Sequence, residues 1–85
     1  MKSFTYVIQD KEGIHARPAG LVVAEAKKFA SVITIENKGK TADLKRIIGV
    51  MALCVKNGEE VLVKAEGADE EAAIAAVEKV FKENL

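Results

Sequence analysis

The alternation of apolar and polar positions along the chain predicts four short β-strands. Residues 3–8 (SFTYVI) alternate aromatic or aliphatic side chains with smaller ones, and residues 31–36 and 60–66 are similarly rich in β-branched residues. Residues 37–40 (NKGK) have the composition of a tight turn. We therefore expect residues 41–44 to pair back on 31–36 as a hairpin.

Three other segments repeat their apolar positions every three or four residues, which indicates helices. They are predicted over residues 16–29, 46–53 and from Asp69 to about Asn84, with Asp69 accepting a capping hydrogen bond from the first turn of the last helix. The positions expected to face the core are Ala19, Val22, Val23, Ala26 and Phe29 in the first helix, Val50 and Leu53 in the second, and Ala73, Ile74, Val77, Val80 and Phe81 in the third.

The order of these elements is β-α-β-β-α-β-α. It predicts an α+β open-faced sandwich of two layers, in which three helices cover one face of a four-stranded antiparallel sheet. A chain of 85 residues is the length of one small domain, so we expect a single domain over residues 1–85.

Charge is balanced over the whole chain but not along it. Thirteen basic residues oppose thirteen acidic ones, which gives no reason to expect a nucleic-acid partner or an anionic membrane surface. Residues 1–57 carry ten basic and five acidic side chains, whereas residues 58–85 carry three and eight. The first part could steer an acidic partner. Alternatively, the last helix is simply acidic on its solvated face.

The remaining composition excludes several classes of protein. Cys54 is the only cysteine and lies in the apolar run IIGVMALCV, so we expect a buried structural thiol and no disulfide. One histidine and one cysteine leave no ordinary metal site within the chain. The first ten residues lack the pattern of a signal peptide, and no apolar stretch is long enough for membrane insertion. These features predict a cytoplasmic protein.

The stretch EGIHARPAG carries the most specific chemistry. His15, the only histidine, comes directly before a predicted helix, whose free N–H groups and positive end bind anions such as phosphate and favour the neutral, nucleophilic imidazole. Arg17 can clamp phosphoryl oxygens, and Pro18 is tolerated in a first helical turn. These are the requirements for phosphoryl acceptance by nitrogen. With no Gly-rich phosphate loop or other nucleotide motif, and no cofactor implied, the phosphoryl group would come from another protein. The alternative is a capping or surface histidine beside an unrelated arginine.

Two surface features accompany this stretch. The first helix has a stripe of small residues, including Gly20, flanked by basic side chains such as Lys27. The short segment 46–53 has a second apolar face of Ile47, Ile48 and Met51, which is either covered by the chain or exposed to a partner. The stripe taken alone is also typical of an ordinary alanine-rich helix surface.

Three segments, in order, resemble the family of HPr, the histidine phosphocarrier of the bacterial phosphoenolpyruvate:sugar phosphotransferase system. They are GIHARPA (13–19), LKRIIGVMALCV (44–55) and EGADEEAAIAAV (66–77). The resemblance implies four antiparallel strands with three helices on one side. It also implies that His15 accepts a phosphoryl group on Nδ1 from phosphorylated enzyme I and passes it to an enzyme IIA domain. Arg17 and the N–H groups of Ala16 and Arg17 would hold that group, and the docking surface would comprise Gly20, Lys27, Ile47, Ile48 and Met51.

One position departs from the resemblance. Many Gram-positive members carry a serine, phosphorylated by a regulatory kinase, where this sequence has Arg46. That regulatory switch therefore cannot be carried over, although Arg46 adds positive charge for docking to acidic partners. The leading interpretation is a phosphocarrier, expected to be a monomer and not itself an enzyme. The alternative is an HPr-like regulatory binding module, a paralogue that acts through protein–protein docking. A hydrolytic enzyme has little support, because the chain shows no evident paired carboxylates.

Overall fold

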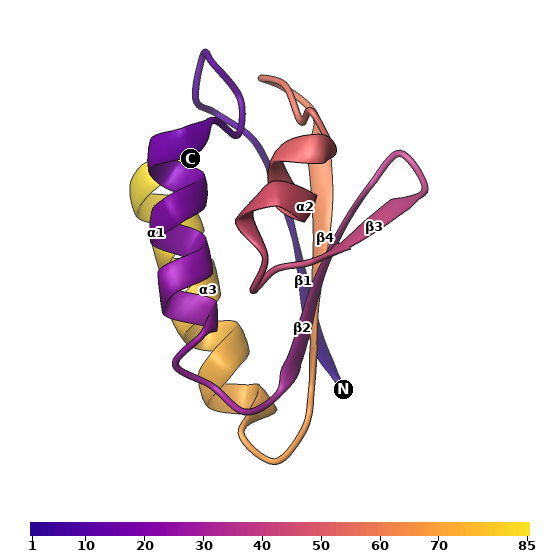
Figure 1. Cartoon of the computed structure of the whole chain (residues 1–85), viewed down its shortest axis with the longest axis vertical. Coiled ribbons are helices and arrows are strands. Elements are labelled where there is room, and N and C mark those ends of the chain that lie inside the picture. Colours follow the sequence, from indigo (N-terminus) through magenta and orange to yellow (C-terminus); the bar gives the residue numbers. More distant parts are fainter.

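A computed structural model describes residues 1–85, and its elements follow the predicted order (Figure 1). The four strands and three helices are β1 (Lys2–Val7), α1 (Ala16–Ala26), β2 (Val32–Asn37), β3 (Lys40–Asp43), α2 (Ile47–Ala52), β4 (Glu60–Glu66) and α3 (Glu70–Asn84). The alternation that predicted 60–66 gives β4 with the expected bounds, with Val61, Val63 and Ala65 buried on one face.

The strands form one antiparallel sheet in the order β1-β4-β2-β3. The β2–β3 hairpin is closed by Lys38 and Gly39, whose φ angles of +52° and +80° give the left-handed pair that a tight two-residue turn requires. The predicted four-stranded antiparallel sheet and hairpin are confirmed. The central strands β4 and β2 are the ones whose inward side chains are most completely buried.

The three helices lie on one face of the sheet, with α1 and α3 side by side and α2 in contact with α1 and β3 (Figure 1). Phe81 of α3 sits at the centre of the core, where its ring meets Phe4 and Tyr6 edge-on at centroid distances of 5.5 and 5.7 Å. Such aromatic pairs each contribute about 1 kcal/mol beyond their burial. The other fully buried helical side chains include Ala19, Val22, Ala26, Val50, Ala73 and Val77. Phe29, Leu53, Ile74 and Val80, which the pattern assigned to the core, are half-buried against it.

The first helix ends at Ala26, three residues before its predicted end. The N–H groups of Lys28 and Phe29 donate to carbonyls three residues back, so the last turn tightens and the chain leaves the helix. Asp69 then holds the connection, because its carboxylate accepts hydrogen bonds from the N–H groups of Ala30 (2.8 Å) and Ser31 (2.9 Å) and from the Ser31 hydroxyl. Asp69 occupies the N-cap position of α3, but its side chain makes no capping bond, so that prediction was wrong.

Cys54 is exposed, so the prediction of a buried thiol was also wrong. The residue follows the last turn of α2 and has φ +52°, a left-handed conformation that is common directly after a helix. This reversal of the chain turns the side chain outward, although the neighbours Val50 and Val55 are buried. An apolar run therefore did not predict the burial of each of its members.

Candidate functional site

His15 is the N-cap residue of α1, with extended backbone angles and a side chain that is 34% exposed. The loop before it turns at Gly13 (φ +71°), whose N–H donates to the Asp10 carbonyl at 3.0 Å. Ile14 then donates to the Val55 carbonyl at 3.0 Å, which ties the loop to the end of α2. A Cβ at Gly13 would lie 2.2 Å from that carbonyl oxygen, so glycine allows the close approach that directs His15 to the surface.

The N-terminus of α1 leaves two donors beside the imidazole. The His15 carbonyl accepts the N–H of Ala19 at 2.9 Å, which is the first hydrogen bond of the helix. Pro18 has no N–H, and the exposed residues Ala16 and Arg17 have N–H groups with no partner in the protein. The positive end of the helix therefore presents two free N–H groups next to His15, an arrangement that suits an oxyanion.

Two carboxylates lie against the imidazole, and neither was predicted from the sequence. His15 Nε2 is 3.3 Å from Asp10 Oδ2 and 3.8 Å from Glu12 Oε2. The hydrogen bond from the Glu12 N–H, and more weakly the contact with His15, hold the pKa of Asp10 below its ordinary value. The sequence does place acidic residues five and three positions before the histidine. The ring therefore lies beside two carboxylates as well as beside the positive end of the helix.

These groups surround a shallow hollow of about 220 Å³ at the start of α1. Arg17 reaches its rim and has no carboxylate partner, so its guanidinium is free to bind an anion. Leu21, which is 47% exposed, also lines it and was not predicted as a surface residue. The hollow is lined by Asp10, Glu12, His15, Arg17, Pro18, Leu21 and Asn84.

Three of these side chains could together hold a metal ion. Asp10, Glu12 and His15 each offer one ligand atom, and these atoms lie within 4.8 Å of one another. The sequence has one histidine and one cysteine, but these two carboxylates add ligand atoms that the expectation of no ordinary metal site left out. Because the cluster is open and uses a single histidine, it is a weak candidate for a resident ion.

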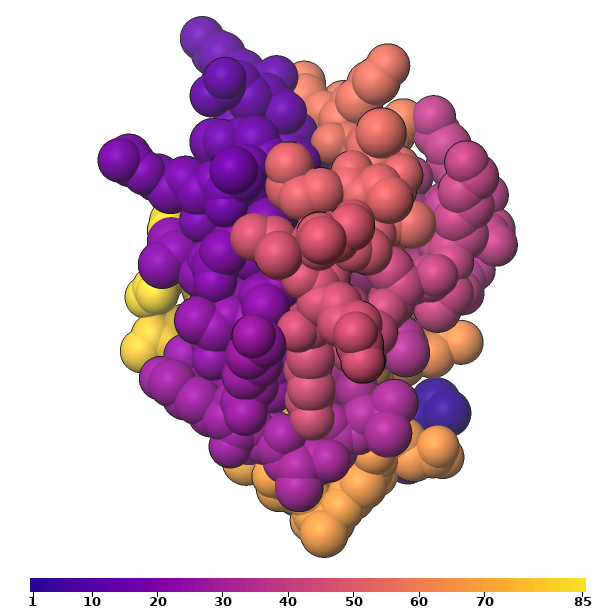
Figure 2. All heavy atoms as spheres, viewed as in Figure 1, coloured from indigo at the N-terminus to yellow at the C-terminus, as the bar shows by residue number.

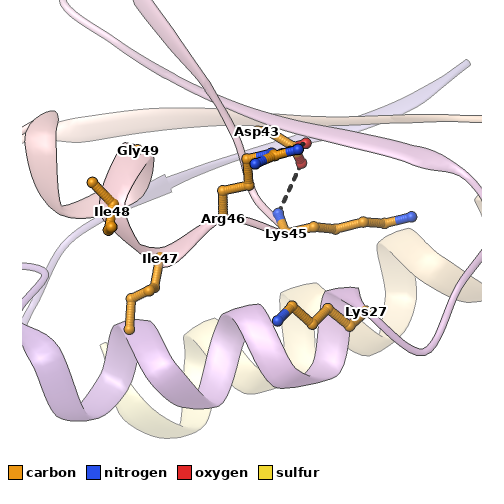
Figure 3. Close-up of a pocket in the computed structure, with 7 residues that line it drawn as sticks. All are labelled: Lys27, Asp43, Lys45, Arg46, Ile47, Ile48 and Gly49. Atoms are coloured by element: carbon orange, nitrogen blue, oxygen red, sulfur yellow. Dashed lines mark hydrogen bonds and ion pairs between the residues drawn. The ribbon is translucent and has the colours of Figure 1, made fainter.

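A second, larger hollow of about 800 Å³ lies between the end of α1 and the start of α2 (Figure 3). Its walls are Lys27, Asp43, Lys45, Arg46, Ile47, Ile48 and Gly49. Lys45 donates to the Phe29 carbonyl at 2.7 Å, and the Arg46 guanidinium extends toward Asp43, with Nε 3.8 Å from its carboxylate. Lys27 makes no ion pair, so three cations face one carboxylate and the hollow is basic.

The predicted docking residues on α1 and α2 lie on one face, which we call the α1–α2 face: Gly20, Lys27, Ile47 and Ile48. Figure 2 shows α1 and α2 side by side on this face, with most of α3 behind them. Ile48 is 82% exposed and Ile47 is 39% exposed, so the second apolar side of α2 is not covered by the chain. Met51 is only half-exposed because it packs against the core. Open space lies beside Gly20, where an added Cβ would meet nothing within 4 Å.

Comparisons with known proteins agree with this geometry. Residues 2–83 match the family model described as "PTS HPr component phosphorylation site". The chain belongs to the HPr family. The phosphocarrier protein HPr of Mycoplasma capricolum is 44% identical over 81 residues, which cover 95% of this chain and 91% of that protein. The HPr family consists of phosphocarrier proteins of the phosphotransferase system, and these proteins are not enzymes.

Solved structures of HPr proteins share the fold. A mycoplasma histidine-containing phosphocarrier protein superposes with a TM-score of 0.95 at 41% identity, covering 96% of this chain and 93% of its own. HPr from Thermoanaerobacter tengcongensis superposes at 0.92 with 45% identity over 96% of this chain and 92% of its own. The structure of an HPr dimer from that organism superposes with a TM-score of 0.78 at 44% identity, covering 98% of this chain and 95% of its own. None of the helices here is both long and apolar enough to cross a membrane.

Proposed function

We propose that this chain is a phosphocarrier in which His15 accepts a phosphoryl group on Nδ1 from phosphorylated enzyme I and passes it to enzyme IIA domains. The observation that carries the proposal is the part-exposed imidazole of His15 at the free N-terminus of α1. Membership of the HPr family supports the same assignment.

The surroundings of the imidazole supply the electrostatics of transfer. The transferred group is an anion, and the free N–H groups of Ala16 and Arg17 meet it with partial positive charge. The unpaired Arg17 guanidinium adds charge-assisted hydrogen bonds to the phosphoryl oxygens. The hollow at His15 is open and shallow, so a donor or acceptor protein can reach the ring nitrogen directly.

The α1–α2 face is the surface on which both partners dock in this proposal, with Met51 at its inner edge. Its exposed isoleucines offer an apolar centre. Lys27, which makes no ion pair, and Arg46, which is paired only with Asp43 at 3.8 Å, offer a basic rim that fits an acidic partner. The proposal places a single HPr-like domain in the cytoplasm as a monomer, with the α1–α2 face left free for its partners.

A second candidate is an HPr-like regulatory binding module, favoured by Arg46 at the position where many relatives carry a regulatory serine. Such a protein would dock through the α1–α2 face without supporting transport. Complementation of a strain that lacks HPr separates the two. Growth on a transported sugar supports the carrier, whereas partner binding without growth supports the module.

The direct test of the carrier is incubation with phosphoenolpyruvate and enzyme I, followed by mass spectrometry of the intact protein. We expect one added phosphoryl group that acid removes, and complete loss of labelling in His15→Ala. Because His15 is the only histidine, this variant leaves no alternative imidazole. A His15→Ala protein that is labelled as fully as the parent would overturn the proposal.

A further inference from the structure

The two nitrogens of the His15 ring have different surroundings. Nε2 faces the carboxylates of Asp10 at 3.3 Å and Glu12 at 3.8 Å, whereas Nδ1 has no hydrogen-bond partner in the protein. An ionised carboxylate can only accept a hydrogen bond. The ring nitrogen that faces both carboxylates is therefore favoured to carry the proton.

Asp10 is held in place by the loop that contains it. Its N–H donates to the Leu85 main-chain oxygen at 2.9 Å, and its carbonyl accepts the N–H of Gly13 at 3.0 Å. Its Oδ1 accepts the N–H of Glu12 at 2.8 Å, which leaves Oδ2 directed at His15. Because three hydrogen bonds fix this residue, the carboxylate is oriented before any partner arrives.

We propose that Asp10, assisted by Glu12, is a positioning residue that fixes the proton of neutral His15 on Nε2 and so keeps the lone pair on Nδ1. This inference rests on the proposed function and extends it, because it names the groups of this chain that select the reacting nitrogen. The second carboxylate contributes less, since Glu12 is farther from Nε2 and its side chain is 76% exposed.

The same arrangement assists the transfer step itself. The Nδ1 lone pair forms the bond to phosphorus, and the bond from phosphorus to the enzyme I nitrogen breaks, with its electron pair leaving on the donor. Nε2 keeps its proton, so the phosphorylated ring gains one positive charge. The carboxylates beside Nε2 stabilise that charge, while Arg17 and the free N–H groups face the phosphoryl oxygens on the other side.

The test compares tautomers by NMR. Protein labelled with ¹⁵N is studied in alkaline buffer, where the ring is neutral, with a chelator present so that no metal occupies Nε2. Long-range ¹H–¹⁵N couplings then report which nitrogen carries the proton. We expect the Nε2–H tautomer to predominate in the parent, and Asp10→Asn to lower the ratio of Nε2–H to Nδ1–H by about fivefold.

Asn is the informative replacement because its Oδ1 can keep the bond to the Glu12 N–H, which places an amide donor where Oδ2 faced Nε2. Glu12→Gln should give a smaller fall, and Glu66→Gln, at the far end of β4, should give none. An unchanged ratio in a folded Asp10→Asn protein overturns the inference, as does a larger fall in Glu12→Gln. The tautomer ratio is read on unphosphorylated protein, so it is independent of whether enzyme I labels His15.

Discussion

At the scale of single residues, Gly13 determines how the loop delivers His15 to the surface. Replacement by alanine strains the backbone at φ +71° and pushes Cβ against the Val55 carbonyl, 2.2 Å away. We expect Gly13→Ala to lower the free energy of unfolding by about 2 to 3 kcal/mol. Urea denaturation followed by circular dichroism measures this change.

Gly20→Ala is the matched control for Gly13→Ala. Gly20 is helical, and an added Cβ there would meet nothing within 4 Å. Alanine should therefore leave stability unchanged or raise it by up to about 1 kcal/mol. Equal effects of the two variants would contradict the steric argument for Gly13.

Arg17 is the second residue whose replacement is informative, because its side chain has no carboxylate partner to lose. Arg17→Ala should slow phosphoryl acceptance about a hundredfold, the typical effect of removing one donor to a developing oxyanion. Arg17→Lys should lie between Ala and the parent, since it keeps the charge but not the planar fork of donors. Rapid-quench kinetics with phosphorylated enzyme I give these rates, and unchanged thermal unfolding shows that the fold is intact. Parent-like rates in Arg17→Ala would remove Arg17 from the site.

The sequence indicated the residues of the site that follow one another along the chain. His15, Arg17 and Pro18 could be placed at a helix start because the periodic pattern begins there and a proline fits the first turn. The contacts of Asp10 and Glu12 with the ring depend on how the loop folds back at Gly13, which no periodicity describes. The outward turn of Cys54 likewise depends on one backbone angle, its φ of +52°.

At the scale of elements, Asp69 links the end of α1 to the start of α3. The pKa of Asp69 lies below its ordinary value of 3.8. The main cause is the hydrogen bond from the Ser31 hydroxyl, and the bonds from the N–H groups of Ala30 and Ser31 add to it. A carboxyl whose pKa is lower in the folded state stabilises the fold above the unfolded value, and this contribution is lost as pH falls through the folded value.

Asp69→Asn should therefore unfold at a lower temperature than the parent at neutral pH. The difference should shrink as pH falls from 3.8 through the lowered pKa of the folded state, because Asp69 of the parent then becomes protonated and loses its charge. Thermal unfolding measured at a series of pH values checks this, with Glu83→Gln, an exposed carboxyl on α3, as the control. A difference that stays constant through the acidic range would assign the effect of Asp69 to packing.

Elements were predicted well where burial on one face sets the pattern and less well where a tertiary contact ends them. The strand at 60–66, β4, has its expected bounds because it lies between β1 and β2 and buries only one of its faces against the core. The first helix ends three residues early, where the N–H groups of Lys28 and Phe29 bond to carbonyls three residues back. Asp69, 39 positions beyond Ala30, then accepts the N–H groups of Ala30 and Ser31. The same carboxylate cannot also cap α3, which is why the predicted capping bond is absent.

At the scale of the whole molecule, the charge asymmetry of the sequence becomes an asymmetry of surfaces. The basic residues Lys27, Lys45 and Arg46 gather around the hollow of the α1–α2 face, while the acidic C-terminal helix lies mostly behind it (Figure 2). A neutral chain of this kind has a dipole that turns one face toward an acidic partner. Docking therefore depends on how the charges are distributed over the surface and not on the balanced net charge.

This asymmetry predicts a salt dependence of phosphoryl transfer that depends on the α1–α2 face. Raising the salt concentration from about 50 mM to about 500 mM should slow transfer from enzyme I roughly tenfold when enzyme I is limiting, since screening removes long-range steering.

Arg46→Glu should slow transfer at low salt and flatten the salt dependence. Its side chain is 81% exposed, so the fold should tolerate the change. Lys79→Glu, an equal change of charge on α3, should leave both quantities near those of the parent. If the two variants respond alike, transfer depends on net charge and the basic hollow has no special part in docking.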